Sequence, residues 1–173
     1  MAKRISEIIL SSKNVTVVSH IDADGISAAG IASASLDRAG IEHNVIFTKQ
    51  LDVNLINRIR DMNPDLVWFT DLGSGQIHEI VDMRAVITDH HFPSNMNPNI
   101  PVEKRKDILE FLDSMSKREV YQLNPHLFGK DGALDISGSG ITYVVARELK
   151  YFNYDLSKYA IVGAVGDLQD NAY

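Results

Sequence analysis

Four short apolar segments, separated by stretches of helical length, are the feature that most restricts the fold of this chain. They are Val15–Val18, Asn44–Phe47, Leu66–Thr70 and Ala85–Thr88. Between them, Ile26–Leu36 and Leu51–Met62 carry apolar residues at helical spacing and end at the turn-forming Gly40 and Asn63-Pro64. Strands alternating with helices in this way predict βαβ units and a parallel sheet, which is apolar on both faces because helices cover both. We therefore predict an α/β fold, a three-layer domain with a mainly parallel β-sheet flanked by helices.

The second half of the chain continues this pattern less regularly. A loop rich in Asn and Pro spans Phe92–Pro101, and a charged amphipathic helix is predicted over Val102–Lys117. Beyond it we predict a strand over Glu119–Leu123, a helix over Ile141–Leu149 and a last, mostly buried helix over Leu156–Leu168. A chain of 173 residues is sized for one domain with its own core.

Acidic residues and histidines follow three of the predicted strands. Asp22 and Asp24 come after the first, Asp71 after the third, and Asp89-His90-His91 after the fourth. Because ligands of open α/β sheets bind outside the carboxyl ends of the strands, these side chains are expected to converge at one edge. Gathered carboxylates repel one another and are costly to desolvate, so a divalent cation is expected among them.

The available side chains narrow the choice of metal. The chain has no cysteine, which excludes disulfides, zinc–thiolate sites and thiol catalysis. Oxygen ligands with imidazole suit Mn²⁺ or Mg²⁺. Asp71, in the middle of the sheet, is placed to bridge two ions about 3.5–4 Å apart.

Each of these clusters can also be explained by a purely structural role. Asp-x-Asp-Gly after a strand is common as a turn and helix N-cap, and paired histidines occur often at surfaces and in cores. Ser137–Gly140 is equally suited to cap and open the helix that follows it. The recurrence of acids at equivalent strand ends is what favours a functional site.

These segments resemble the motifs of a known family. Ser19–Gly25, Asp71–Gly73 and Thr88–His91 are similar to the first three motifs of the DHH phosphoesterase superfamily, and Gly163–Asp167 to the fourth. Asn124–Gly129, together with Ser137–Gly140, resembles the archaeal RecJ-like, single-strand-specific nucleases that associate with GINS. The resemblance spans about residues 14 to 170, nearly the whole chain.

The resemblance implies a role for each matching residue. One ion would be held by Asp24, Asp71, His90 and Asp167. The second would be held by Asp22 and Asp71, with His20 as a further candidate. His20 departs from several family branches, which place this histidine where the chain has Val18. Asp89 would support the imidazoles from behind, and the substrate phosphate would contact His91, with Ser139 and Gly140 as further candidates.

The resemblance also implies a function. It indicates a metal-dependent exonuclease on single-stranded DNA or RNA, in which two ions, Mn²⁺ or Mg²⁺, activate a water. The implied setting is DNA replication and repair in the cytoplasm, with GINS or a fork-processing helicase as partner. Two alternatives remain open: a hydrolase of short oligonucleotides or cyclic dinucleotides, and an inactive replication scaffold of the same fold.

Charge and chain length qualify this expectation. A formal charge of −6 is unusual for a nucleic-acid-binding protein and slightly favours a small substrate. Family members usually carry a second, smaller C-terminal domain, and we expect none after Tyr173. We therefore expect residues 1–173 to be the catalytic DHH domain alone, a truncated chain or natural fragment with weak activity. No window approaches the roughly 20 apolar residues of a membrane span, and we expect no membrane partner.

Overall fold

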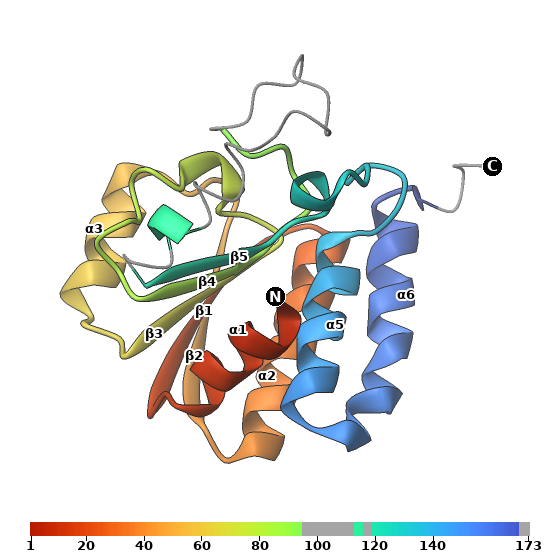
Figure 1. Ribbon diagram of the computed structural model, residues 1–173, viewed down its shortest axis with the longest axis horizontal. Helices are drawn as coiled ribbons and strands as arrows, with labels where there is room; N and C mark the ends of the chain where they lie inside the picture. The colour runs from red at the N-terminus through yellow and green to blue at the C-terminus, as the bar shows by residue number, and fades with distance from the viewer. Residues whose placement is uncertain (95–112, 116–118, 170–173) are drawn as a thin grey trace.

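The computed structural model describes residues 1–94, 113–115 and 119–169 and shows one parallel sheet (Figure 1). The strands lie in the order β2-β1-β3-β4-β5, and every neighbouring pair is parallel. Their bounds are β1 Asn14–His20, β2 Glu42–Thr48, β3 Leu66–Thr70, β4 Ala85–Thr88 and β5 Val120–Leu123. All five strands were predicted, with bounds that differ from the expected ones only at their ends.

Helices cover both faces of this sheet, which confirms the predicted three-layer α/β fold. The α-helices are α1 Ala2–Leu10, α2 Ala23–Ala39, α3 Val53–Asp61, α5 Gly138–Leu149 and α6 Ser157–Gly166. Short 3₁₀ helices are η1 Ser74–Gln76, η3 Pro125–Phe128 and η4 Tyr151–Leu156. In Figure 1, α3 lies on one face and α1, α2, α5 and α6 lie on the other.

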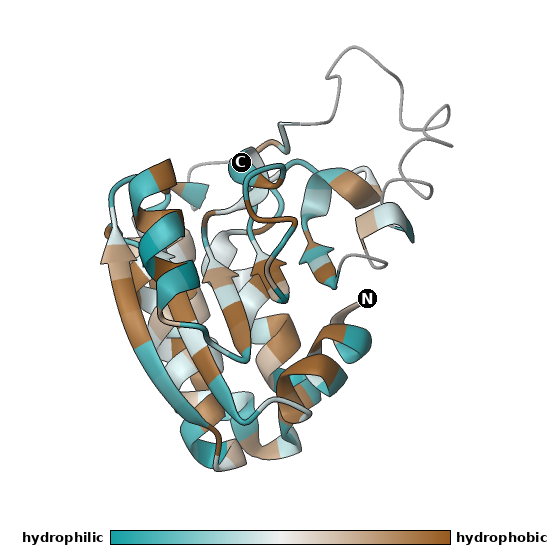
Figure 2. Cartoon of the chain, turned by 90° about the vertical axis from the view of Figure 1, so that its left-hand side faces the viewer, coloured by the Kyte–Doolittle hydropathy of each residue, from teal (hydrophilic) through white to brown (hydrophobic). Residues whose placement is uncertain are grey.

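The apolar strands supply a separate core on each side. Phe69 and Ile87 pack with α3 residues such as Ile59, whereas Trp68 and Val86 pack with α1, α2 and α5. Successive side chains of a strand point to opposite faces, so one uninterrupted apolar run serves both cores. Figure 2 shows the resulting brown segments along the strands.

The last helix corrects one expectation. We predicted a mostly buried helix over Leu156–Leu168, but within α6 only Gly163 is buried, and Ile161 and Val162 are 65% and 58% exposed. A helix that is apolar on every side gives no indication of which side packs. It lies against α2 and α5 along the side that carries Gly163.

One further difference concerns the N-terminus. Helix α1 was not predicted, although Ile5, Ile8 and Ile9 have helical spacing and are buried. The predicted helix over Val102–Lys117, and the loop before it beyond Ser94, lie largely outside the described residues. In the part of the chain that is described, no helix has the length and apolar character needed to cross a membrane.

Candidate metal centre

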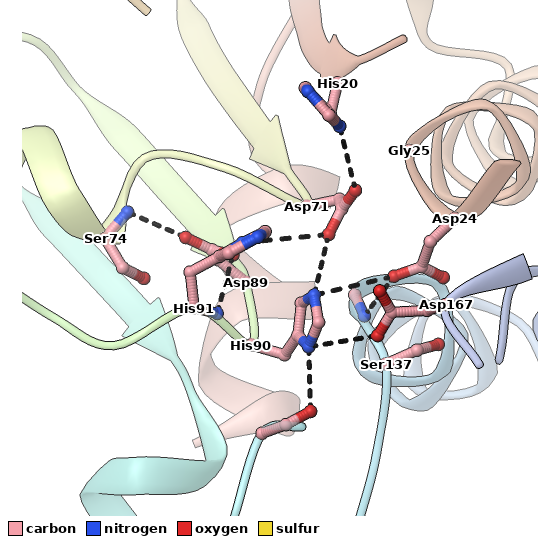
Figure 3. A network of polar contacts seen from close by, with 12 residues as sticks. His20, Asp24, Gly25, Asp71, Ser74, Asp89, His90, His91, Ser137 and Asp167 are labelled. Atoms are coloured by element: carbon pink, nitrogen blue, oxygen red, sulfur yellow. Dashed lines mark hydrogen bonds and ion pairs between the residues drawn. The ribbon is translucent and has the colours of Figure 1, made fainter. Parts of the chain in front are cut away.

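Most of the predicted site residues lie close together at the carboxyl edge of the sheet, and Figure 3 shows Asp24, Asp71, His90 and Asp167 among them. His20 is the last residue of β1, Asp71 follows β3 directly, and Asp89-His90-His91 follow β4. Asp167 reaches the same place from the C-terminal end of α6. The parallel strands thus bring together residues that are far apart in the sequence.

Helix N-termini position the first two aspartates. Asp22 is the N-cap of α2, and its Oδ1 accepts a hydrogen bond of 2.8 Å from the Gly25 amide. Asp24 lies in the first turn and is only 2% exposed. Its two oxygens accept hydrogen bonds from the amides of Gly138 (2.7 Å) and Ser139 (3.0 Å), at the N-terminus of α5.

Asp71 is the central residue of the site. Its carboxylate lies 3.2 Å from His90 Nε2, 3.9 Å from His20 Nδ1 and 3.9 Å from His91 Nδ1. The side chain is 1% exposed, yet among the described residues neither of its oxygens has a hydrogen-bond partner. Its backbone has a φ of 58°, a conformation that non-glycine residues adopt rarely and that clusters at functional sites.

Such a carboxylate fits a cation. Leaving a buried acceptor unsatisfied is costly, and a charged one more so. A divalent ion would satisfy both oxygens and offset the repulsion from Asp24 and Asp89. The residues present therefore suit the metal that the sequence predicts.

His90 is oriented so that one nitrogen remains available. Its Nδ1 lies 2.8 Å from the carbonyl oxygen of Gly132, to which it can donate a proton. Its Nε2 then faces Asp71, with Asp24 Oδ2 at 3.9 Å. Backbone carbonyls orient many metal-binding histidines in this way.

The candidate ligands form overlapping groups on either side of Asp71. One comprises Asp24, His90 and Asp167, and another comprises His20, Asp22 and Asp71. A third joins Asp71 to His90 and His91. Within each group the ligand atoms lie within 4.8 Å of one another, close enough to share an ion.

Asp89 supports His91 rather than both imidazoles. Its Oδ1 accepts a hydrogen bond of 2.8 Å from His91 Nδ1, and its Oδ2 accepts one of 2.9 Å from the Ser74 amide. Asp89 is fully buried, whereas the His91 side chain is 57% exposed. The arrangement leaves His91 Nε2 free to meet a ligand.

The start of α5 bears on a further expectation. Ser139 and Gly140 were candidates for contact with a substrate phosphate; Ser139 is fully buried, whereas Gly140 is half-buried. The Ser139 amide donates to Asp24, and the Gly140 amide donates to Ser137 Oγ. This helix N-terminus therefore holds a candidate metal ligand, a role that sequence alone did not suggest.

Backbone groups of Gly132 and Gly138 are the parts of the site that sequence reasoning missed. A Cβ at Gly138 would lie 2.5 Å from Asp71 Oδ1, and one at Gly132 would overlap the His90 carbonyl. In the sequence, Gly132 marked only a loop and Gly138 only the start of a helix. Which side chain each approaches depends on the tertiary fold.

Burial and crowding change the acidity of the site. Burial raises the pKa of Asp71 to about 7, assisted by the charges of Asp24 and Asp89 and opposed by His90. Burial acts to lower the pKa of His90, but Asp71, the Gly132 carbonyl and Asp167 outweigh it and raise the value to about 10. Burial also raises the pKa of Asp167. Without a cation, the site retains protons at neutral pH.

We expect Mn²⁺ to displace these protons. Both raised pKa values favour the protonated forms at lower pH, so Mn²⁺ affinity should increase as pH rises from about 6 to about 8. Calorimetric titrations in buffers of different ionisation enthalpy would count the protons, and about one or more per chain is expected near neutral pH. A binding heat independent of the buffer would contradict this expectation.

The chain resembles part of a longer protein in sequence. No protein-family model matches the chain. An uncharacterised protein of Methanocaldococcus jannaschii is 38% identical over 177 aligned positions, which cover 99% of this chain but 37% of that protein. The chain thus spans little more than a third of the length of this relative.

Solved structures identify the fold more closely. The exonuclease RecJ bound to manganese superposes with a TM-score of 0.70 at 18% identity, covering 96% of this chain and 42% of RecJ. RecJ from Thermus thermophilus in complex with Mn²⁺ gives 0.69 at 18% identity, over 99% and 25% of the two chains. Cdc45 from Entamoeba histolytica gives 0.60 at 18% identity, over 93% and 31%. The chain has the RecJ-like DHH fold that its motifs imply.

Proposed function

We propose that this chain, which has the RecJ-like DHH fold, is the catalytic domain of a metal-dependent phosphodiesterase, an exonuclease on single-stranded DNA or RNA. The observation that carries the proposal is the buried Asp71 carboxylate, which lacks hydrogen-bond partners among the described residues and lies between groups of candidate ligands. The fold shared with manganese-bound RecJ structures supports it.

The candidate ligands would hold two ions, Mn²⁺ or Mg²⁺. Asp24, His90 and Asp167 surround one position, His20 and Asp22 flank the other, and Asp71 lies between. When bound, the ions supply the positive charge that lowers the pKa of a water and offsets charge on the phosphate.

The remaining residues act on the substrate and on one another. Asp89 fixes the ring of His91 through Nδ1 and raises its pKa, so that Nε2–H can donate to a phosphate oxygen. The α5 N-terminus orients Asp24, and the Gly132 carbonyl orients His90. We further propose a cytoplasmic role in replication and repair, with GINS or a fork-processing helicase as partner.

A second candidate function is hydrolysis of short oligonucleotides or cyclic dinucleotides. The net charge of −6 and a pocket of about 260 Å³ beside Asp71 favour short substrates over long ones. The likeness to Cdc45 is a likeness in fold, and it is equally compatible with an inactive scaffold. Against a scaffold, the candidate ligands Asp22, Asp24, Asp71, His90 and Asp167 are all present.

Hydrolysis assays would separate these functions. We expect the chain with Mn²⁺ to shorten end-labelled single strands and to leave duplexes intact, with no hydrolysis in a chelator. Cleavage confined to dinucleotides would favour the second function. If Mn²⁺ binds but neither single strands nor dinucleotides are cleaved, the enzyme proposal is wrong.

A further inference from the structure

A fully buried asparagine, Asn124, lies behind the Asp89-His90-His91 motif. It follows β5 directly and is the N-cap of η3, at the start of a segment, Asn124–Gly129, that supplies none of the candidate ligands. An amide is costly to bury unless its donors and its acceptor find hydrogen-bond partners. The partners of this side chain therefore indicate what it does.

The hydrogen bonds of Asn124 determine which way its amide points. Its Oδ1 accepts a hydrogen bond of 3.0 Å from the backbone amide of His126, which can only donate. Its Nδ2 donates to the carbonyl oxygen of His91 at 2.8 Å and to Ser74 Oγ at 2.9 Å. A carbonyl oxygen can only accept, so the reversed amide would place acceptor against acceptor and donor against donor.

These two donations reach both ends of the structure that holds His91. The Ser74 amide donates to Asp89 Oδ2, and Asp89 Oδ1 accepts from His91 Nδ1 (Figure 3). Asn124 thus holds the backbone of His91 directly and supports its ring through Ser74 and Asp89. Because the His91 side chain is 57% exposed, packing restrains the ring only in part, and these hydrogen bonds determine where Nε2 points.

Gln122 contributes to the same network from within β5. Its Nε2 donates to Ser74 Oγ, so this hydroxyl accepts from two buried amides. A hydroxyl oxygen has two acceptor lone pairs, and both are used here. Gln122 acts at Ser74, whereas Asn124 contacts both Ser74 and His91.

We propose that Asn124 is a positioning residue, which holds His91 so that its free ring nitrogen, Nε2, faces the phosphate of the substrate. The inference rests on the proposed function, in which His91 donates a hydrogen bond to that phosphate. A displacement of about 1 Å, caused far from the chemistry, can cost about 100-fold in rate. Asn124 should therefore affect turnover although it is buried behind the site.

The substitution Asn124→Ser separates this role from helix capping. Serine is also a good N-cap, so its Oγ can still accept from the His126 amide, but one short hydroxyl cannot replace both donations of Nδ2. With saturating Mn²⁺, kcat on end-labelled single strands should fall by about 10- to 100-fold. KM and the Mn²⁺ affinity should stay at the parent values.

Asn153→Ser is the matched control. Asn153 is also fully buried, and its Nδ2 donates to the carbonyl oxygen of Ala146, in α5. Both substitutions should lower the thermal unfolding midpoint, because each removes a buried donor from its partner. Only Asn124→Ser should lower kcat, which separates positioning from a general loss of stability.

Nuclear magnetic resonance provides a measurement that needs no turnover. The proton on His91 Nδ1, hydrogen-bonded to the buried Asp89, should give a slowly exchanging signal in the parent and in Asn153→Ser. In Asn124→Ser this signal should be lost or shifted, because the ring is no longer held in place.

The outcomes separate this inference from the proposed function. If the His91 signal or kcat is unchanged in Asn124→Ser, or if Asn153→Ser lowers kcat as much, the inference is wrong, even where strands are cleaved. If the parent cleaves nothing, the proposed function fails, and the His91 signal alone then decides whether Asn124 positions this ring.

Discussion

Replacing Asp71 by asparagine is expected to abolish Mn²⁺ binding. Asp71 belongs to two of the candidate ligand groups and faces the third through His90, so its loss affects every position. The affinity should fall by more than the roughly 100-fold that loss of an outer supporting residue costs. Isothermal titration of the parent and of Asp71→Asn with Mn²⁺ would measure it.

The same substitution should stabilise the chain when no metal is present. The pKa of Asp71 is about 7 in the folded chain and 3.8 without the fold. The protonated carboxyl of Asp71 therefore stabilises the fold fully below about pH 3.8. This stabilisation declines as pH rises and is lost above about pH 7. At about 1.4 kcal/mol per pH unit, ionisation costs the parent on the order of 4 kcal/mol at pH 8, a value that already includes the opposing effect of His90. A neutral amide does not bear this cost.

Thermal unfolding at about pH 8 in a chelator should thus give a higher midpoint for Asp71→Asn than for the parent, and Mn²⁺ should reverse the order. Asp61→Asn is the matched control, because Asp61 is exposed at the end of α3 and should change neither property. Equal Mn²⁺ affinity in Asp71→Asn and the parent would contradict the assignment of the site.

Two glycine-to-alanine substitutions are expected to change stability in opposite directions. Gly163 and Gly30 both lie inside helices, but a Cβ at Gly163 would overlap the Ser139 side chain and the Asp24 carboxylate. At Gly30 a Cβ would meet no atom within 4 Å. Gly163→Ala should lower the free energy of unfolding by about 1–3 kcal/mol, as overpacking does. Gly30→Ala should raise it by about 1 kcal/mol through helix propensity.

Gly163→Ala should also weaken Mn²⁺ binding. The added methyl group displaces Asp24 or moves α6 outward, and α6 carries Asp167 at its C-terminal end. Urea unfolding and Mn²⁺ titration of both variants would test the pair. Equal stabilisation by the two substitutions would show that α6 does not pack on Asp24 as described.

Local patterns in the sequence predicted most of the fold. Apolar runs such as Leu66–Thr70 and Ala85–Thr88 form strands with the predicted bounds. In a parallel sheet, strand ends also determine where neighbouring side chains meet. That rule placed Asp22, Asp71 and His90 at one edge before any geometry was known.

The features that were not predicted depend on which way a side chain or a backbone amide faces, and a local sequence pattern does not specify this. Helix α6 was expected to be mostly buried, and the apolar sequence of its second half does not reveal that Ile161 faces outward. Ser139 was expected at a substrate phosphate, but the tertiary fold turns its amide toward Asp24.

The convergence of Asp24, Asp71, His90 and Asp167 has a consequence for folding. These residues span most of the chain, and Asp24 is held by amides 114 and 115 positions away. An ion at this centre would therefore cross-link segments that are far apart in the sequence. Because this cross-link can form only after the long-range contacts have formed, metal should do little to speed folding. It should instead slow unfolding, so the lifetime of the folded chain would report how much metal is available.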